Sequence, residues 1–214
     1  MARFPTATGG LNNSIEIGLA PSGADMEMSE RIRKALSDRR RRIVAPNRLT
    51  RAAVLFPLFE KGGRYHVLLT KRTDRVKHHK GEISFPGGVA DEGDEDTEAT
   101  ALRETFEEIG LPREGMEILG KLDDAVTVSS AHLVTPIVAK IAYPYPFSVN
   151  EEEIEELIEI PLEAFLEENR WMEEPHSSGD KKVLSYSFEY EGRIIWGATA
   201  RIIRQFLDIL FEDQ

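Results

Sequence analysis

The alternation of apolar and polar positions predicts a protein built mainly from short strands. Two apolar runs rich in β-branched and aromatic residues, 52–59 and 65–70, are separated by Glu60-Lys61-Gly62-Gly63-Arg64, which is typical of a β-hairpin turn. Such strands beside few helices favour an α+β fold, a sandwich around a mixed sheet. The same pattern predicts further strands at about 116–122, 132–141, 154–160, 183–190 and 194–196.

Helical periodicity marks the remaining ordered segments. Ser22 or Asp25 is expected to cap a first helix that runs to about Arg42. We expect an N-terminal arm and helix at 1–45 and one larger domain at 46–214, which is long enough to bury a core. Further helices are expected at about 97–109 and 198–211, and a short one at 161–166.

Composition limits the chemistry and the partners. The 214 residues include no cysteine, so a metal ion must be held by oxygen or imidazole ligands. The opening MARFPTATGGLNNS lacks the pattern of a signal peptide, and no apolar run is long enough to cross a bilayer. We therefore expect a cytoplasmic protein with no membrane partner. The net charge of -11 argues against a nucleic-acid partner.

The charge is distributed unevenly along the chain. Residues 151–174 are strongly acidic, whereas 30–51 and 64–80 are basic. For Arg39 to Arg42 the favoured interpretation is a solvated helix or loop face. The segment 64–80 differs because it leads directly into a glycine-rich turn, which suits the binding of an anion.

Three glutamates cluster on the second predicted helix. Because successive helical residues are about 100° apart, Glu104, Glu107 and Glu108 share one face. A solvated acidic face explains this spacing by itself, but Mg²⁺ prefers carboxylate oxygens and would offset the repulsion between the three charges. The apolar residues of the same helix are expected on the opposite, core-facing side: Leu102, Phe106 and Ile109.

The sequence around this helix favours the metal site. Gly87-Gly88 is followed by an acidic loop and by ALRETFEEIGL at 101–111. This arrangement resembles the signature box of the Nudix hydrolases, with a first loop one residue longer than in the common box. The resemblance implies an α/β/α sandwich around a mixed β-sheet, in which a loop, helix and loop bind Mg²⁺ or Mn²⁺.

The resemblance also implies roles for individual residues. The metal ligands would be Glu104, Glu107 and Glu108, the last two taking part in catalysis. Arg103 would orient a carboxylate such as Glu95 through an ion pair.

A general base is also needed, and in this family it often comes from a glutamate in a distant loop. Glu151, Glu152 and Glu153 are available, and Glu153 is the favoured choice.

The segment upstream of the helix narrows the substrate. LLTKRTDRVKHHKGEISFPGG, residues 68–88, resembles the extra motif of the coenzyme A pyrophosphatase branch, with Thr73 and Lys77 departing from the usual residues. The resemblance spans about 55–210. It implies a coenzyme A-like small-molecule substrate, cut into 3',5'-ADP and phosphopantetheine or its acyl form. The expected substrate-binding residues are Arg72, Lys77, Gly87 and Gly88.

Two other functions stay open from the sequence. The signature box specifies a pyrophosphate and not its substituents, so ADP-ribose or another nucleoside diphosphate derivative is an alternative substrate. A catalytically silent binding or regulatory module with this fold is the second alternative. The family resemblance is also compatible with a homodimer, for which the N-terminal helix is available.

Several other residues are weaker candidates for function. His78 and His79 suit a phosphate contact and a solvated basic loop equally well. Trp196 and Phe206 are expected in the core rather than against a nucleotide base, and His132 is expected to be structural.

Overall fold

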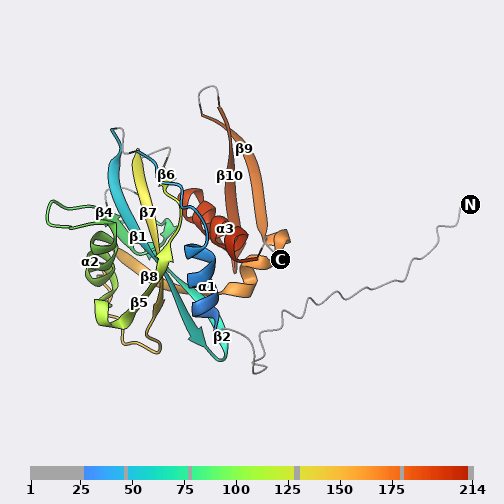
Figure 1. Ribbon diagram of the computed structural model, residues 1–214. Helices are drawn as coiled ribbons and strands as arrows, with labels where there is room; N and C mark the ends of the chain where they lie inside the picture. Colours follow the sequence, from blue (N-terminus) through green and yellow to red (C-terminus); the bar gives the residue numbers. More distant parts are fainter. Residues whose placement is uncertain (1–26, 46–47, 77–78, 128–130, 179–180, 212–214) are drawn as a thin grey trace, which may run out of the picture.

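The computed structural model describes residues 27–45, 48–76, 79–127, 131–178 and 181–211 (Figure 1). An eight-stranded mixed sheet lies at its centre, ordered β3-β2-β1-β7-β5, with β4 beside β1, β6 beside β7 and β8 beside β2. Strands β1 and β7 pair in parallel, and the other pairs are antiparallel. The strands are β1 Thr50–Lys61, β2 Arg64–Arg72, β3 Ile83–Ser84, β4 Gly87–Val89, β5 Met116–Lys121, β6 Ala125–Val126, β7 His132–Ile141 and β8 Ile154–Pro161.

Helices cover both faces of this sheet. Helix α2 packs on one face, and α1 and α3 lie on the other, beside a smaller antiparallel sheet ordered β11-β10-β9 (Figure 1). These elements are α1 Met28–Ser37, α2 Thr97–Ile109, α3 Gly197–Phe211, β9 Trp171–Ser178, β10 Lys181–Tyr190 and β11 Arg193–Trp196. Short 3-10 helices occupy Arg113–Gly115, Leu162–Leu166 and Glu168–Arg170.

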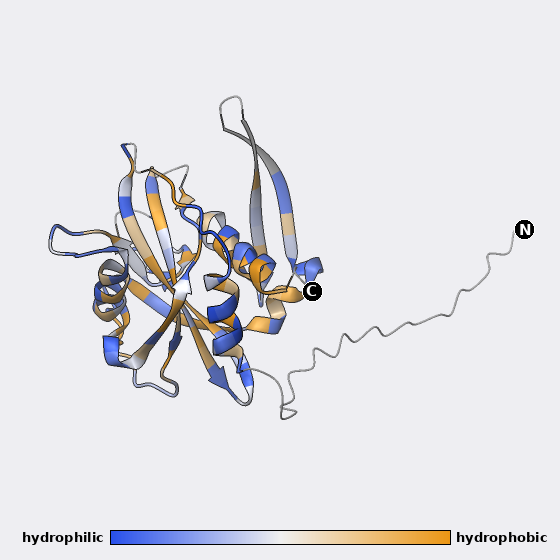
Figure 2. Ribbon diagram, in the orientation of Figure 1, coloured by the Kyte–Doolittle hydropathy of each residue, from blue (hydrophilic) through white to orange (hydrophobic). Residues whose placement is uncertain are grey.

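Strand β1 supplies side chains to two hydrophobic cores. Its even-numbered residues Ala52 and Phe56 join the core shared with α1 and α3, and the odd-numbered Ala53 and Leu55 join the core under α2. A strand covered on both faces is apolar at nearly every position, which explains the uninterrupted run at 52–59. Figure 2 shows apolar residues along the central strands and on the helix sides that face them.

The segment after α1 has no regular secondary structure and packs against residues 122–124. Arg39 forms an ion pair with Asp123, and Arg41 forms one with the buried Asp124. The Asp124 carboxylate also accepts the Val44 N–H at 2.9 Å. These contacts fix residues 39–44, which we call the N-terminal strap, against the chain between β5 and β6.

The expected α/β/α sandwich around a mixed sheet is confirmed, but several predicted element boundaries differ from the structure. The proposed caps at Ser22 and Asp25 lie outside the described residues. Helix α1 ends at Ser37, so the predicted end at Arg42 is wrong. The solvated interpretation holds for Arg40 and Arg42, which are exposed. It fails for Arg39 and Arg41, because the Asp123 and Asp124 carboxylates bind them. Strand β9 was not predicted, and the segment 162–166 is a 3-10 helix.

Helix α1 is part of the main core. Its residues Met28, Ile32 and Leu36 are buried in the same cluster as α3 and one face of β1. The predicted division of the chain at residue 45 therefore stays a prediction, because α1 packs with the central sheet. Within the described residues, no helix combines the length and apolar character needed to span a membrane.

Candidate active site

Helix α2 has well-defined ends, which fix the positions of its charged side chains. At its N-terminus the Asp96 carboxylate accepts the backbone N–H groups of Glu98 and Ala99 at 2.8 and 2.9 Å. At its C-terminus Gly110 adopts a φ of 69° and donates its N–H to the Phe106 carbonyl. The predicted helix over 97–109 is confirmed residue for residue.

The orientation of α2 differs from the prediction. Ala101 and Thr105 are small and fully buried, and α2 packs there on β1 and β4. This approach turns Glu108 toward the sheet, where the residue is 3% exposed, and leaves Phe106 56% exposed. The placement of Phe106 in the core was therefore wrong. The glutamates do not share one solvated face, because Glu108 is buried, Glu104 is partly buried and Glu107 is exposed.

Glu108 is a buried carboxylate with two partners. Its Oε2 accepts the Gly87 N–H at 3.1 Å, and its Oε1 lies 3.3 Å from Nη1 of Arg72. Burial raises the pKa of Glu108 to about 8, although the Gly87 hydrogen bond and the Arg72 charge oppose that shift. Arg72 also reaches Glu153, with 3.6 Å between Nη2 and Oε2.

Arg103 connects the acidic loop to the helix glutamates. It forms two 3.0 Å contacts with the carboxylate of Asp94, and its Nη1 lies 2.8 Å from Glu104 and 3.2 Å from Glu107. Hydrogen bonding to Arg103 holds the pKa of Asp94 well below its usual range. The expected partner Glu95 is exposed, so that assignment is corrected to Asp94.

Two glycines let the chain approach the carboxylates closely. A Cβ on Gly87 would lie 2.4 Å from the Ala53 carbonyl oxygen, and one on Gly88 would lie 2.5 Å from the Glu104 carboxylate. Gly87 also has a φ of +145°, which L side chains rarely adopt. The turn after Phe85-Pro86 therefore places backbone directly against Glu104 and Glu108.

The donor set suits a hard divalent cation. Glu104, Glu107 and Glu108 offer only carboxylate oxygens, which are typical ligands of Mg²⁺. Burial raises the pKa of Glu104, and the charges of Glu107 and Glu153 add to that effect while Arg103 opposes it. A bound cation would offset this crowding of negative charge. Among the described residues no three such side chains already converge as metal ligands, because Arg103 lies between Glu104 and Glu107.

The remaining predicted residues fall in different places. Glu153 lies beside Arg72 with its side chain 46% exposed, whereas Glu151 and Glu152 face solvent. Lys77 and His78 lie outside the described residues. The role of Asp94 as the ion-pair partner of Arg103 was not predicted from the sequence. The available signal was its position two residues before Asp96, which caps α2.

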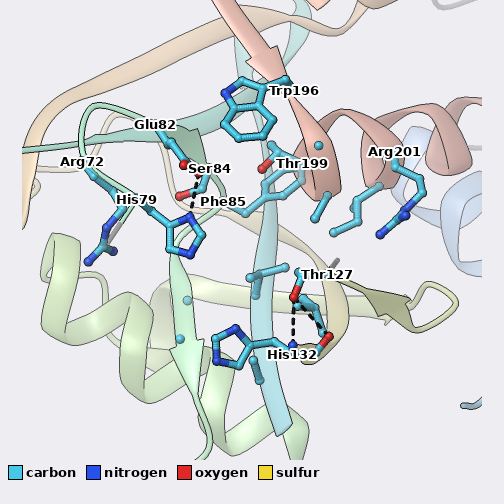
Figure 3. Close-up of a pocket in the computed structure, with 18 of the residues that line it drawn as sticks. Arg72, His79, Glu82, Ser84, Phe85, Thr127, His132, Trp196, Thr199 and Arg201 are labelled. Atoms are coloured by element: carbon cyan, nitrogen blue, oxygen red, sulfur yellow. Dashed lines mark hydrogen bonds and ion pairs between the residues drawn. The ribbon is translucent and has the colours of Figure 1, made fainter. Parts of the chain in front are cut away.

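A cavity of about 580 Å³ lies beside these residues, between the central sheet and the C-terminal elements (Figure 3). Arg72, Gly87 and Gly88 form its wall toward α2, while β10, β11 and the first turns of α3 form the other wall. Trp196 lines the cavity and is 51% exposed, so its expected burial in the core was wrong. Phe206 is buried as predicted.

Two histidines also face this cavity. His79 and His132 both line it, although they come from a loop and from β7. The purely structural interpretation of His132 therefore misses its position at the cavity, which the parallel pairing of β1 with β7 produces. Burial, followed by the charge of His79, lowers the pKa of His132.

Comparison with known proteins agrees with this geometry. The NUDIX domain model matches residues 48–185, from just before β1 into β10. A relative from Yersinia pestis strain Pestoides F, described as the uncharacterized Nudix hydrolase NudL, is 42% identical over 155 residues, which cover 72% of this chain and 76% of the relative.

Solved structures are similar at a lower level. A C. elegans Ap4A hydrolase in a binary complex is 24% identical with a TM-score of 0.45, and covers 54% of this chain and 82% of its own. The NUDIX domain of Shewanella oneidensis NrtR, complexed with ADP ribose, is 19% identical with a TM-score of 0.42. The match covers 57% of this chain and 81% of the NrtR domain.

Proposed function

The chain belongs to the Nudix family of pyrophosphohydrolases, and from that premise we propose that it hydrolyses coenzyme A or acyl-coenzyme A. The products would be 3',5'-ADP and phosphopantetheine or its acyl form. One observation carries the proposal: Arg72, Gly87 and Gly88, from the segment 68–88 that resembles the coenzyme A pyrophosphatase motif, line the cavity. The same three residues lie against the carboxylates of Glu104 and Glu108.

The reaction requires attack by water on one phosphorus of the pyrophosphate. The water oxygen forms a new P–O bond, the bridging P–O bond breaks, and each product keeps one of the two phosphorus atoms of the pyrophosphate. Nudix hydrolases generally use Mg²⁺ or Mn²⁺, which neutralises developing charge and lowers the pKa of bound water. We propose that Glu104, Glu107 and Glu108 hold this ion, and that Glu107 and Glu108 act in catalysis.

The neighbouring side chains position these carboxylates and the substrate. Arg103, anchored by Asp94, orients Glu104 and Glu107. Arg72 supplies charge for the pyrophosphate, and its Nε is buried without a hydrogen-bond partner in the described part of the chain. An anionic substrate offers such a partner. Glu153, beside Arg72, takes a proton from the attacking water.

A Nudix hydrolase of ADP-ribose or another nucleoside diphosphate derivative is the second candidate. Thr73 and Lys77 favour it, because both depart from the coenzyme A motif, and lysine lacks the bidentate fork of arginine. Homodimerisation and a cytoplasmic location stay predictions.

A substrate panel tests the proposal. The full chain is incubated with Mg²⁺ or Mn²⁺ and with coenzyme A, acyl derivatives, ADP-ribose, NADH and dinucleoside polyphosphates, and the products are resolved chromatographically. We expect the highest kcat/KM with coenzyme A or an acyl derivative. Equal or faster turnover of ADP-ribose would overturn the coenzyme A assignment, and no turnover of any compound would favour a silent binding module.

A further inference from the structure

The cavity carries a positive charge at the end far from the carboxylates. Figure 3 shows Arg72 and Arg201 on opposite sides, with Arg201 projecting from the first turns of α3. Its Nη2 donates to the Val126 carbonyl at 2.6 Å. Among the described residues Arg201 forms no ion pair with a carboxylate, and burial lowers its pKa.

A second guanidinium lies near Arg201 and adds to the charge. Arg42 of the N-terminal strap lowers the pKa of Arg201 further through charge repulsion. The neighbouring Arg39 and Arg41 are paired with Asp123 and Asp124, but Arg42 has no such ion pair in the described part of the chain. Arg42 is exposed, and its backbone N–H donates to the Asp123 carboxylate at 2.9 Å, which fixes the main chain of the strap at this point.

We propose that Arg201, assisted by Arg42, binds a phosphate monoester of the substrate that is separate from the pyrophosphate. In the substrate proposed above, this group is the 3'-phosphate on the ribose. Arg201 is therefore a specificity-determining residue, and the cavity holds the 3'-phosphoadenosine half of the molecule. This inference rests on the proposed function for the identity of the substrate, but the phosphate site itself can be tested by binding alone.

The uncompensated charge decides which half of the substrate enters the cavity. A partly buried cation without a counterion is costly, and an anionic ligand reduces that cost. Pantetheine carries no anion to meet Arg201, whereas the nucleotide half carries the 3'-phosphate. The rest of the wall is compatible with this choice, because the half-exposed indole of Trp196 gives an adenine ring an aromatic surface.

Binding measurements on the full chain test the site directly. Calorimetric titration with 3',5'-ADP and with 5'-AMP compares ligands that differ by the 3'-phosphate. We expect the wild type to bind 3',5'-ADP at least tenfold more tightly, and Arg201→Gln to lose roughly 10- to 100-fold in affinity for 3',5'-ADP while keeping that for 5'-AMP.

A matched control lies one turn further along α3. Arg204→Gln removes a guanidinium that is paired with Glu168 and Asp208, and we expect it to preserve the preference. Arg42→Gln should reduce the preference for 3',5'-ADP less than Arg201→Gln does. Kinetically, Arg201→Gln should raise KM for coenzyme A and leave kcat/KM for dephospho-coenzyme A unchanged.

Two results would overturn the inference. One is a wild type that binds 3',5'-ADP and 5'-AMP equally. The other is an Arg201→Gln variant that loses affinity for both nucleotides to the same extent, which would assign the residue to fold support through the Val126 carbonyl. If coenzyme A is not hydrolysed but ADP-ribose is, the proposed substrate fails, while the binding contrast still decides the phosphate site.

Discussion

At the α2 end of the cavity, carboxylates crowd together and arginines lie between them. At the α3 end, the guanidinium groups of Arg201 and Arg42 form no ion pair with a carboxylate among the described residues. The α2 end is nearly complete in itself: Asp94, Arg103 and Glu104 satisfy one another, and Glu108 is bound by Gly87 and Arg72. At the α3 end, the hydrogen-bond partner of the Arg201 guanidinium among the described residues is the Val126 backbone carbonyl.

This difference separates two tasks. A network of opposite charges holds reactive groups in a fixed geometry, and a cation is needed to balance it further. An uncompensated guanidinium instead gains most when an anionic ligand arrives, so it contributes to choosing the substrate. The cavity therefore joins an end suited to chemistry with an end suited to selection.

The largest effect is expected from the acidic end. Glu107→Gln should lower kcat by roughly 10²- to 10³-fold, because an amide is a weaker ligand for a divalent cation than a carboxylate. The side chain is 54% exposed, so the thermal midpoint of unfolding should change little. Steady-state kinetics and calorimetry measure both. Glu114→Gln, on the exposed turn after α2, is the control, and a wild-type rate for Glu107→Gln would contradict its assigned role.

A smaller loss is expected from Gly88→Ala. The added methyl group would displace the Glu104 carboxylate, which is the flexible end of its side chain, so activity should fall about 100-fold with little loss of stability. Gly93→Ala is the matched control in the acidic loop, where a Cβ meets no atom within 4 Å. Equal activity of the two variants would show that the position of Glu104 is unimportant.

The Asp94 and Arg103 pair should have a moderate effect. Asp94→Asn is expected to lower kcat about tenfold and the free energy of unfolding by about 1–2 kcal/mol, whereas Glu95→Gln should be neutral. Because Arg103 depresses the pKa of Asp94, the stabilisation is complete above the ordinary pKa of 3.8 and disappears as pH falls through the lowered value.

Chemical denaturation at several pH values measures this dependence. The wild type should exceed Asp94→Asn in stability by a constant amount near neutral pH, and the difference should shrink in strong acid. A larger loss of stability from Glu95→Gln than from Asp94→Asn would instead support Glu95 as the partner of Arg103, as the sequence predicted.

The smallest effect on catalysis is expected at the N-terminal strap. Arg41→Gln leaves the buried Asp124 without its charged partner and should lower the free energy of unfolding by about 1–3 kcal/mol. The kcat of the folded protein should stay within about twofold, because the strap contacts none of the α2 carboxylates. Arg40→Gln, at an exposed position, should be neutral in denaturant titrations. Equal stabilities of Arg41→Gln and Arg40→Gln would show that Arg41 is a solvated surface residue without a structural role.

The sequence was most informative where the pattern is local. The helix at 97–109, the hairpin and strand β7 depend on contiguous residues, so periodicity and turn residues suffice to predict them. The rotation of α2 was not predictable in this way. Glu108 is buried because Ala101 and Thr105 permit close packing on β1 and β4, and periodicity alone gives no weight to size.

The cavity was beyond prediction for a related reason. Its wall combines β1, the loop before β3, the start of β7 and the C-terminal elements, which only tertiary packing brings together. Trp196 therefore seemed a core residue, although it lies at the end of a short strand beside the cavity. Arg201 gave no local signal, because the sequence does not show that its described neighbours include no carboxylate partner.

The parallel pairing of β1 with β7 has a consequence for the order of assembly. Five strands and helix α2 lie between β1 and β7 in the sequence. Phe56 on β1 is also covered by Phe206 of α3, with 4.6 Å between ring centroids. Contacts between distant segments form slowly because long loops must close first. We expect the hairpin β1–β2 to gain amide protection early in pulsed hydrogen exchange and α3 late. A newly folding chain would then form helix α2 before the cavity beside it is complete.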